Sequence, residues 1–327
     1  MSRIGIGLIG VGKHGTRYAA HIRRDLPDLR LVAIARRDLT AARQQAAEFG
    51  CRAYGDYQEL IAAPDVDALI VVVPPTAHPS IMEAAAAACR PVLLEKPAAA
   101  NVADGERIRH AVSTAGIPVM VAQTVRYASA VKLLLQERDT IGQLHALRLS
   151  QRFEPSRPGW IDDPAIAGGG MTLHTGVHIF DLARVLTGME ADRVSCEMAK
   201  VRTARTEDNF AAVIRFGSGN GTVLATIAGS RATASRSGAI EMAGEHGQLV
   251  ADHVFNTASV VRGAESTPLV VPPPVPTVLE VLRDFTRALR SGSAMPIPLE
   301  EGLRAVAIVD ACYRSATSGC TAAVTRL

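Results

Sequence analysis

Residues 4–15 of this 327-residue chain read Ile-Gly-Ile-Gly-Leu-Ile-Gly-Val-Gly-Lys-His-Gly, an apolar run that ends in a glycine-rich turn. A helix-like segment from Thr16 to Leu26 follows and stops before Pro27. Strand, glycine turn and helix in this order are typical of a loop that binds the phosphates of a dinucleotide at the helix N-terminus. The motif alone is weak, but the flanking strand and helix favour it over a plain turn. The predicted cofactor contacts in this loop are Gly10, Val11, Gly12, Lys13, His14 and Gly15.

Strand and helix signals alternate from the N-terminus to about residue 122. Residues 68–73 form an unbroken run rich in Val and Ile, as a parallel strand buried on both faces requires, and 91–95 and 118–122 repeat the pattern. Helical stretches separate these runs. Residues 1–122 are therefore predicted to form a doubly wound, parallel α/β domain of the Rossmann type that binds a dinucleotide.

Beyond residue 122 the pattern changes. A helix at about 171–186 follows three consecutive glycines, and strand-like segments then succeed one another from 194 to 251 with Gly and Ser turns between them. Such a run predicts a mostly antiparallel, open sheet. The proline-rich stretch 268–276 is predicted to be a surface connection before two closing helices. Residues 123–327 are accordingly predicted as one α+β domain for substrate binding and oligomerisation.

The composition is that of an ordinary globular protein. Thirty-five basic and 32 acidic side chains leave a net charge of +3 without a long run of one sign, so nucleic acid and membrane surfaces are not expected partners. Five scattered cysteines without a C-x-x-C pair are expected to be reduced thiols. The apolar start is too short and too rich in glycine for a signal peptide, and no apolar stretch is long enough to span a bilayer. A cytoplasmic location is predicted.

The residues that end the second predicted strand bear on the choice of cofactor. In this fold an acidic residue about 20 positions past the glycines binds the adenosine ribose of NAD. Here the corresponding stretch is Ala35-Arg36-Arg37-Asp38. A guanidinium binds a 2′-phosphate, which a carboxylate would repel, so Arg36 and Arg37 predict NADP(H) over NAD(H). The alternative is that both arginines are solvated and Asp38 binds the ribose.

Two stretches carry residue types suited to chemistry. Lys96 follows a predicted parallel strand at its carboxyl end, where open α/β sheets bind ligands. At about 100° per residue, His174, His178 and Asp181 share an arc of roughly 60° on one helix face. Judged by periodicity alone, such a helix face is more often a partly exposed surface with hydrogen-bonded histidines than a catalytic site. No third ligand completes a zinc site, so a metal is not predicted.

On these residues the chain resembles the glucose-fructose oxidoreductase, inositol dehydrogenase and MocA family over essentially its whole length. The resemblance rests on the order and spacing of Gly10 to Gly15, Thr76-Ala77-His78, Glu95-Lys96-Pro97, Gln123 with Arg126-Tyr127, Gly159-Trp160, and Gly168-Gly169-Gly170 running to Gly176-Val177-His178. It implies a two-domain NAD(P)-dependent dehydrogenase acting on sugars, cyclitols or related alcohols. It also implies a homo-oligomer formed through the open sheet.

The resemblance also implies roles for individual residues. Lys96 would polarise the reacting oxygen, and His178 would exchange a proton with the reacting hydroxyl, which suits a histidine at neutral pH. Tyr127 and Trp160 would line the substrate. The implied cofactor contacts beyond the glycine loop and the two arginines are Pro74, His78, Glu95, Lys96 and Gln123.

The chain departs from the family pattern at residue 174, where an aspartate is usual and His174 stands instead. Three explanations remain open: Asp181 orients His178, Lys96 carries the proton alone, or His174 binds an acidic substrate. Arg126, Arg152 and Arg157 lie near this region in sequence and suit the third explanation. The sequence predicts an NADP(H)-dependent oxidoreductase that interconverts a secondary alcohol and a ketone on a sugar-like, sugar-acid or cyclitol substrate. The alternative is a nucleotide-binding regulator without turnover.

Overall fold

The computed structural model describes residues 2–155, 159–217 and 221–327. The chain divides into two compact units. Unit 1 comprises Met1–Gln123 and Pro276–Leu303, and unit 2 comprises Thr124–Val275 and Arg304–Leu327. The predicted boundary after residue 122 placed 276–303 in the second domain, whereas these residues pack with the first unit because the chain returns to it after the large sheet.

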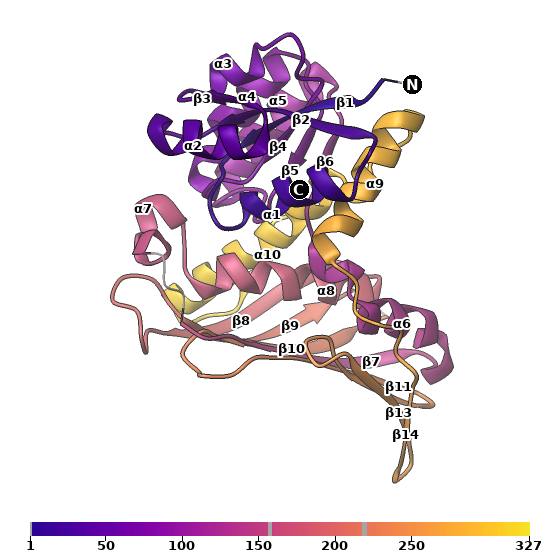
Figure 1. Cartoon of the computed structure of the whole chain (residues 1–327). Coiled ribbons are helices and arrows are strands. Elements are labelled where there is room, and N and C mark those ends of the chain that lie inside the picture. The colour runs from indigo at the N-terminus through magenta and orange to yellow at the C-terminus, as the bar shows by residue number, and fades with distance from the viewer. Residues whose placement is uncertain (1, 156–158, 218–220) are drawn as a thin grey trace. The chain divides into compact units, whose positions relative to one another are not determined.

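Unit 1 is built on a six-stranded sheet in the order β3-β2-β1-β4-β5-β6, in which every neighbouring pair is parallel. Helices lie on both faces of this sheet (Figure 1). The predicted doubly wound α/β fold is therefore confirmed. Its strands are β1 Ile4–Ile9, β2 Leu29–Ala35, β3 Arg52–Tyr54, β4 Ala68–Val71, β5 Val92–Leu94 and β6 Val119–Val121. Its helices are α1 Gly15–Arg24, α2 Leu39–Phe49, α3 Tyr57–Ile61, η1 Pro75–Ala77, α4 His78–Ala87, α5 Val102–Ala115 and α9 Thr277–Ser291.

The central strands of unit 1 are buried on both faces, as their apolar runs predict. All four residues of β4 are buried, as are the three of β5 and the three of β6. Strand β3 was not predicted, because its three residues carry no apolar run. Its pairing with β2 supplies the signal that the local sequence lacks.

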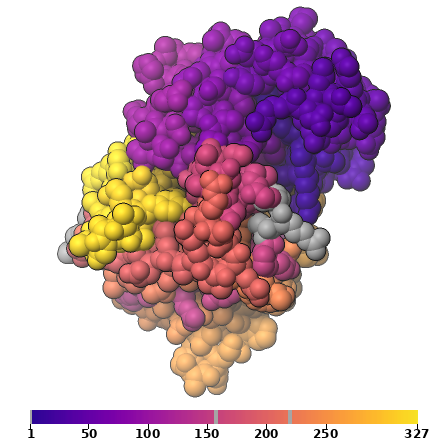
Figure 2. Space-filling view, turned by 90° about the vertical axis from the view of Figure 1, so that its left-hand side faces the viewer, coloured from indigo at the N-terminus to yellow at the C-terminus, as the bar shows by residue number. Residues whose placement is uncertain are grey.

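Unit 2 is built on a nine-stranded sheet in the order β14-β13-β12-β11-β7-β10-β9-β8-β15. The pair β7–β10 is parallel and the other seven pairs are antiparallel, which confirms a mostly antiparallel sheet. The strands are β7 Leu144–Arg152, β8 Ala191–Ala199, β9 Asn209–Phe216, β10 Val223–Ser230, β11 Ser237–Gly244, β12 Gly247–Asp252, β13 Thr257–Arg262, β14 Glu265–Pro268 and β15 Ala322–Ala323. The hairpin β13–β14 projects from the body of the unit (Figures 1 and 2).

Among the residues that the structure describes, helices cover one face of this sheet and not the other. Helices α6 and α8 lie over the same face in Figure 1, and that face holds the apolar core of the unit. The helical segments are η2 Thr124–Tyr127, α6 Ser129–Glu137, η3 Arg138–Ile141, η4 Gly159–Asp162, α7 Pro164–Ala167, η5 Thr172–Gly176, α8 Val177–Thr187 and α10 Leu299–Ser318, which begins in unit 1. Alternate residues of β9 and β10 are buried and exposed, so the second face of the sheet is open.

The predicted helix at 171–186 begins with a turn of π-helix, η5, before α8. A π-turn adds a residue to the helical repeat and therefore changes which side chains share a face. Both η5 and the first turn of α8 carry a candidate site histidine, His174 and His178. The predicted 60° arc assumed a regular α-helix, and the π-turn replaces that geometry.

Candidate active site

The carboxyl ends of the parallel strands in unit 1 meet along one edge of the sheet. The residue after β1, Gly10, donates its N–H to Ala35 O, and the residue after β5, Glu95, donates to Val71 O, both at 2.9 Å. Ala122, after β6, donates to Leu94 O at 2.9 Å. These bonds keep successive strand ends in register. All predicted cofactor residues follow strands at this edge: Gly10, Val11, Gly12, Lys13, His14, Gly15, Arg36, Arg37, Pro74, His78, Glu95, Lys96 and Gln123.

The glycine loop has the geometry that a phosphate site needs. Gly10 has a φ of +92°, and a methyl group there would lie 2.2 Å from Val72 O. A methyl group on Gly15 would lie 2.0 Å from Gly10 O, so the close approach of α1 requires glycine. A methyl group on Gly12 would meet no atom within 4 Å, so this backbone faces open space. No described side chain caps the N-terminus of α1, and its first turn has no acidic residue, which leaves a positive helix end for phosphates.

Glu95, the residue after β5, accepts three hydrogen bonds at this edge. Its side chain is nearly fully buried, and it accepts hydrogen bonds from His14 Nε2 at 2.7 Å, Tyr18 Oη at 2.5 Å and its neighbour's amide, Lys96 N, at 3.0 Å. Burial raises the pKa of Glu95, whereas the hydrogen bond and charge of His14 and the charge of Lys96 lower it. The lowering effects are larger together, so the pKa of Glu95 lies below its usual value. The ionised carboxylate thus joins the glycine loop, helix α1 and the turn that carries Lys96.

His78, the first residue of α4, contacts two backbone carbonyls at the same edge of the sheet. The ring is fully buried, with Nδ1 3.2 Å from Ala98 O and Nε2 3.1 Å from Val73 O. Burial lowers the pKa of His78, although the backbone carbonyls and Glu95 oppose that shift. His78 therefore links the loop after β4, which includes Pro74, to the loop after β5, which includes Lys96.

After the end of β2, Arg36, Arg37 and Asp38 differ in their hydrogen bonds and in their exposure. Asp38 Oδ1 accepts the N–H of Ala41 at 3.0 Å and so caps the N-terminus of α2. Arg36 is half-buried and its Nη1 donates to Gln45 at 3.2 Å, whereas Arg37 is exposed.

In unit 2, Trp160 and His174 lie together. Their ring centroids are 5.6 Å apart in an edge-to-face arrangement, and His174 is buried while Trp160 is 37% exposed. His174 Nε2 lies 3.0 Å from Ala167 O. A carbonyl only accepts, so this nitrogen carries the proton. The predicted substrate residue Tyr127 is 7% exposed, and Lys132 Nζ lies 5.3 Å from its ring centroid.

Asp181, offered above as a partner for His178, is bound by an arginine. Arg126 donates Nε to Asp181 Oδ2 at 2.7 Å and Nη2 to Oδ1 at 2.5 Å, and Asp181 is buried. Arg184 Nη1 lies 3.8 Å from the same carboxylate. The charge of Arg126, which had suited an acidic substrate, is therefore compensated by Asp181. Arg157, another of those cations, lies outside the described residues.

A hollow of about 160 Å³ lies beside the start of η5, the π-turn that precedes α8. Its lining includes Gly170, Met171, Glu207 and Arg231. Glu207 accepts from Thr172 N at 2.9 Å and Tyr313 Oη at 2.8 Å, while Arg231 donates to Thr175 Oγ1 at 2.6 Å. Burial lowers the pKa of Arg231 to about 10, and the charge of Glu207 opposes that shift. Arg231 therefore places a half-buried cation beside η5.

Sequence reasoning missed Tyr18, Gln45, Glu207 and Arg231. Each reaches its partner from a separate element, so local spacing carries no signal for it. Tyr18 did carry a signal, because a tyrosine on the apolar face of a helix is expected to be buried and to need a hydrogen-bond partner for its hydroxyl. The structure shows it fully buried.

Within 2–155, 159–217 and 221–327, no three His, Cys, Asp or Glu side chains come together as a metal site. Across that same part of the chain, every helix is too short or too polar to cross a bilayer.

The doubly wound sheet, its glycine loop and the second, largely antiparallel sheet define a dinucleotide-binding oxidoreductase class. Residues 4–123 match the model of the oxidoreductase family with an NAD-binding Rossmann fold, and residues 129–250 match the GFO/IDH/MocA C-terminal domain. The chain belongs to this family of oxidoreductases, as its resemblance had predicted.

Relatives of known name cover nearly the whole chain. Myo-inositol 2-dehydrogenase of Thermotoga maritima is 30% identical over 325 residues, which cover 95% of each protein. D-apiose dehydrogenase of Paraburkholderia graminis is 27% identical over 96% of this chain and 88% of its own. The crystal structure of an oxidoreductase domain protein from Kribbella flavida is similar over 100% of both chains, with a TM-score of 0.89 and 25% identity.

Proposed function

We propose that the protein is an NADP(H)-dependent dehydrogenase that interconverts a secondary alcohol and a ketone on a sugar-like, sugar-acid or cyclitol substrate. The cofactor preference rests on one observation: a half-buried arginine, Arg36, stands at the end of β2, where NAD-specific folds carry an acidic residue. Asp38, the nearest carboxylate in sequence, is engaged as the cap of α2. NAD(H) is proposed as the second, less preferred cofactor.

The substrate class draws on the named relatives. Myo-inositol 2-dehydrogenase is named for a cyclitol and D-apiose dehydrogenase for a sugar, and the chain aligns with most of the length of both. Both names describe oxidation of a polyhydroxylated substrate.

The chemistry is assigned to two residues. When bound, the nicotinamide supplies or accepts the hydride. His178, in the first turn of α8, accepts the hydroxyl proton during oxidation and returns it during reduction. Lys96, directly after Glu95, donates a hydrogen bond to the reacting oxygen and stabilises the charge that develops there. Residues 1–122 are proposed to bind the cofactor, and residues 123–327 the substrate, with Tyr127, Trp160 and His174 as contacts.

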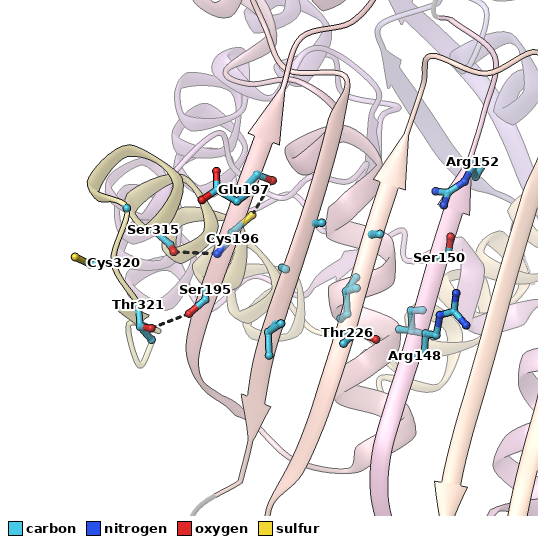
Figure 3. A pocket seen from close by; sticks show the side chains of 17 residues that line it. Arg148, Ser150, Arg152, Ser195, Cys196, Glu197, Thr226, Ser315, Cys320 and Thr321 are labelled. Carbon is cyan, nitrogen blue, oxygen red and sulfur yellow. Dashed lines mark hydrogen bonds between the residues drawn. The ribbon is translucent and has the colours of Figure 1, made fainter.

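We also propose a homo-oligomer in which a second copy covers the open sheet face of unit 2. That face carries exposed apolar residues, including Val213 at 53% and Leu224 at 56%. It also has a hollow of about 490 Å³ over β7, β8, β9 and β10 (Figure 3). Arginines of β7 line one side of it and Glu197 of β8 the other, with small and apolar residues of β9 and β10 between them. Such a mixture of charged and apolar residues suits an interface with a second copy. The five free cysteines support the proposed cytoplasmic location.

Turnover tests the reaction directly. Purified protein is incubated with NADP or NAD and a panel of neutral sugars, sugar acids and cyclitols, and the absorbance of the reduced nicotinamide is recorded. We expect turnover of at least one panel member, faster with NADP. Tight NADP(H) binding without turnover in either direction would instead favour the regulator.

The variant His178→Ala tests the proton-transfer role. We expect kcat to fall about 100-fold or more with little change in the Kd for NADP. His145→Ala removes an exposed histidine of β7 and serves as the matched control. Unchanged turnover in His178→Ala would refute the assignment.

A further inference from the structure

The side chain of Gln45 joins Arg36 to the glycine loop. Gln45 lies in α2, and its Oε1 accepts from Arg36 Nη1 at 3.2 Å. Its Nε2 donates to Val11 O at 3.1 Å, and Val11 is the second residue of the glycine motif. One amide thus bridges the end of β2 and the turn after β1.

The chemistry of the two partners determines the orientation of this amide. A guanidinium has only donors and a backbone carbonyl only accepts. The reversed amide would set donor against donor at Arg36 and acceptor against acceptor at Val11. The bridge therefore needs one donor and one acceptor on the same side chain, which Gln45 supplies.

Arg36 is held at both ends. Its backbone N–H donates to Tyr54 O of β3 at 3.1 Å, and its guanidinium is held by Gln45. The guanidinium has further donors beyond the Nη1 that Gln45 engages, and a planar guanidinium can bind two oxygens of a phosphate at once. An arginine that is held before binding loses less conformational freedom when it meets its ligand.

We propose that Gln45 is a positioning residue for cofactor choice, which holds Arg36 for the 2′-phosphate of NADP(H) and ties it to the phosphate loop. The inference rests on the proposed NADP(H) preference and deepens it. Gln45 itself need not touch the cofactor. Its effect should therefore appear for the phosphorylated cofactor and require Arg36.

The test compares the Kd values of NADP and NAD for the wild type, Gln45→Met and Gln45→Glu. Methionine keeps the length of the side chain and suits a helix but removes both hydrogen bonds. We expect Gln45→Met to raise the Kd for NADP about 5- to 10-fold and that for NAD less than about twofold. Gln45→Glu should weaken NADP binding further, because the carboxylate neutralises Arg36 and repels the phosphate. Gln44→Met, exposed on the same helix, is the matched control and should match the wild type.

The Arg36→Ala background completes the test. There, adding Gln45→Met should change the Kd for NADP less than about twofold, because no guanidinium is left to hold. Equal loss of NADP and NAD affinity in Gln45→Met, or no loss, would overturn the role of Gln45. A wild type that binds NAD more tightly than NADP would overturn the cofactor preference of the proposed function instead. The wild-type ratio is measured first, so the two failures are distinguished.

Discussion

Three donors from separate segments converge on the buried carboxylate of Glu95. His14 comes from the glycine loop, Tyr18 from α1 and the amide of Lys96 from the turn after β5. Burying an ionised carboxylate is costly unless its oxygens are hydrogen-bonded. Each donor therefore stabilises the negative charge of a carboxylate that is shielded from water. Burial, followed by the charge of Glu95, raises the pKa of Tyr18 well above its usual value, so the hydroxyl stays protonated and can donate.

Removing one of these donors should reduce stability measurably. We expect Tyr18→Phe to cost about 1–2 kcal/mol, because the ring is kept while the buried carboxylate loses a hydrogen bond. The midpoint of thermal unfolding should fall by a few degrees, on the order of 2–4 °C per kcal/mol for a unit of this size. Tyr57→Phe, a half-buried tyrosine on α3, is the control and should unfold like the wild type. An unchanged midpoint in Tyr18→Phe would show that the hydroxyl adds nothing.

Helix α8 is joined to the segment before α6 by a buried ion pair. Arg126 of η2 binds both oxygens of Asp181, and their side chains are 17% and 2% exposed. The pair anchors the helix that carries His178, just after the π-turn that carries His174. The histidines therefore sit on an element whose position depends on a distant arginine.

Breaking this pair should cost far more than breaking an exposed one. We expect Arg126→Met to destabilise the protein by about 3 kcal/mol, because Asp181 would keep a buried charge with a weaker partner. Arg205→Met removes a surface pair with Asp163 at 3.2 Å and should cost less than about 1 kcal/mol. Urea unfolding midpoints of the two variants decide the comparison. Equal midpoints would mean that the Arg126–Asp181 pair stabilises the protein no more than the surface pair does.

The chain as a whole forms two compact units, each with its own sheet and core. Unit 1 covers both faces of its sheet with helices, whereas unit 2 covers one (Figure 1). An open face with exposed valine and leucine is typical of a protein–protein interface. The proposed second copy accounts for it.

A charge on that face should shift the oligomeric state. We expect Val213→Glu to lower the mass measured by light scattering, because two like charges would face each other across a two-fold interface. Val270→Glu places the same charge on the proline-rich connection, where Val270 is 92% exposed, and should leave the mass unchanged. If Val213→Glu keeps the wild-type mass, the open face is not the interface.

Much of the fold is predictable from the sequence because its signals are local. The apolar runs of β4, β5 and β6 and the glycine loop depend on neighbouring residues and were recognised from them. Strands β3, β13 and β14 were not, because pairing rather than an apolar run creates them. The site divides in the same way: the glycines and Lys96 lie in local motifs, whereas the partners of Glu95 and Asp181 come from elsewhere in the chain.

The sequence by itself determined the two folds, the nucleotide-binding loop and the arginine at the end of β2, since backbone conformation and burial patterns are properties of short stretches. The tertiary structure alone decided that Asp181 pairs with Arg126, that Asp38 caps a helix, and that Gln45 links Arg36 to Val11. Those outcomes depend on which donor reaches which acceptor across the folded chain. Residue spacing along the sequence does not encode that distance.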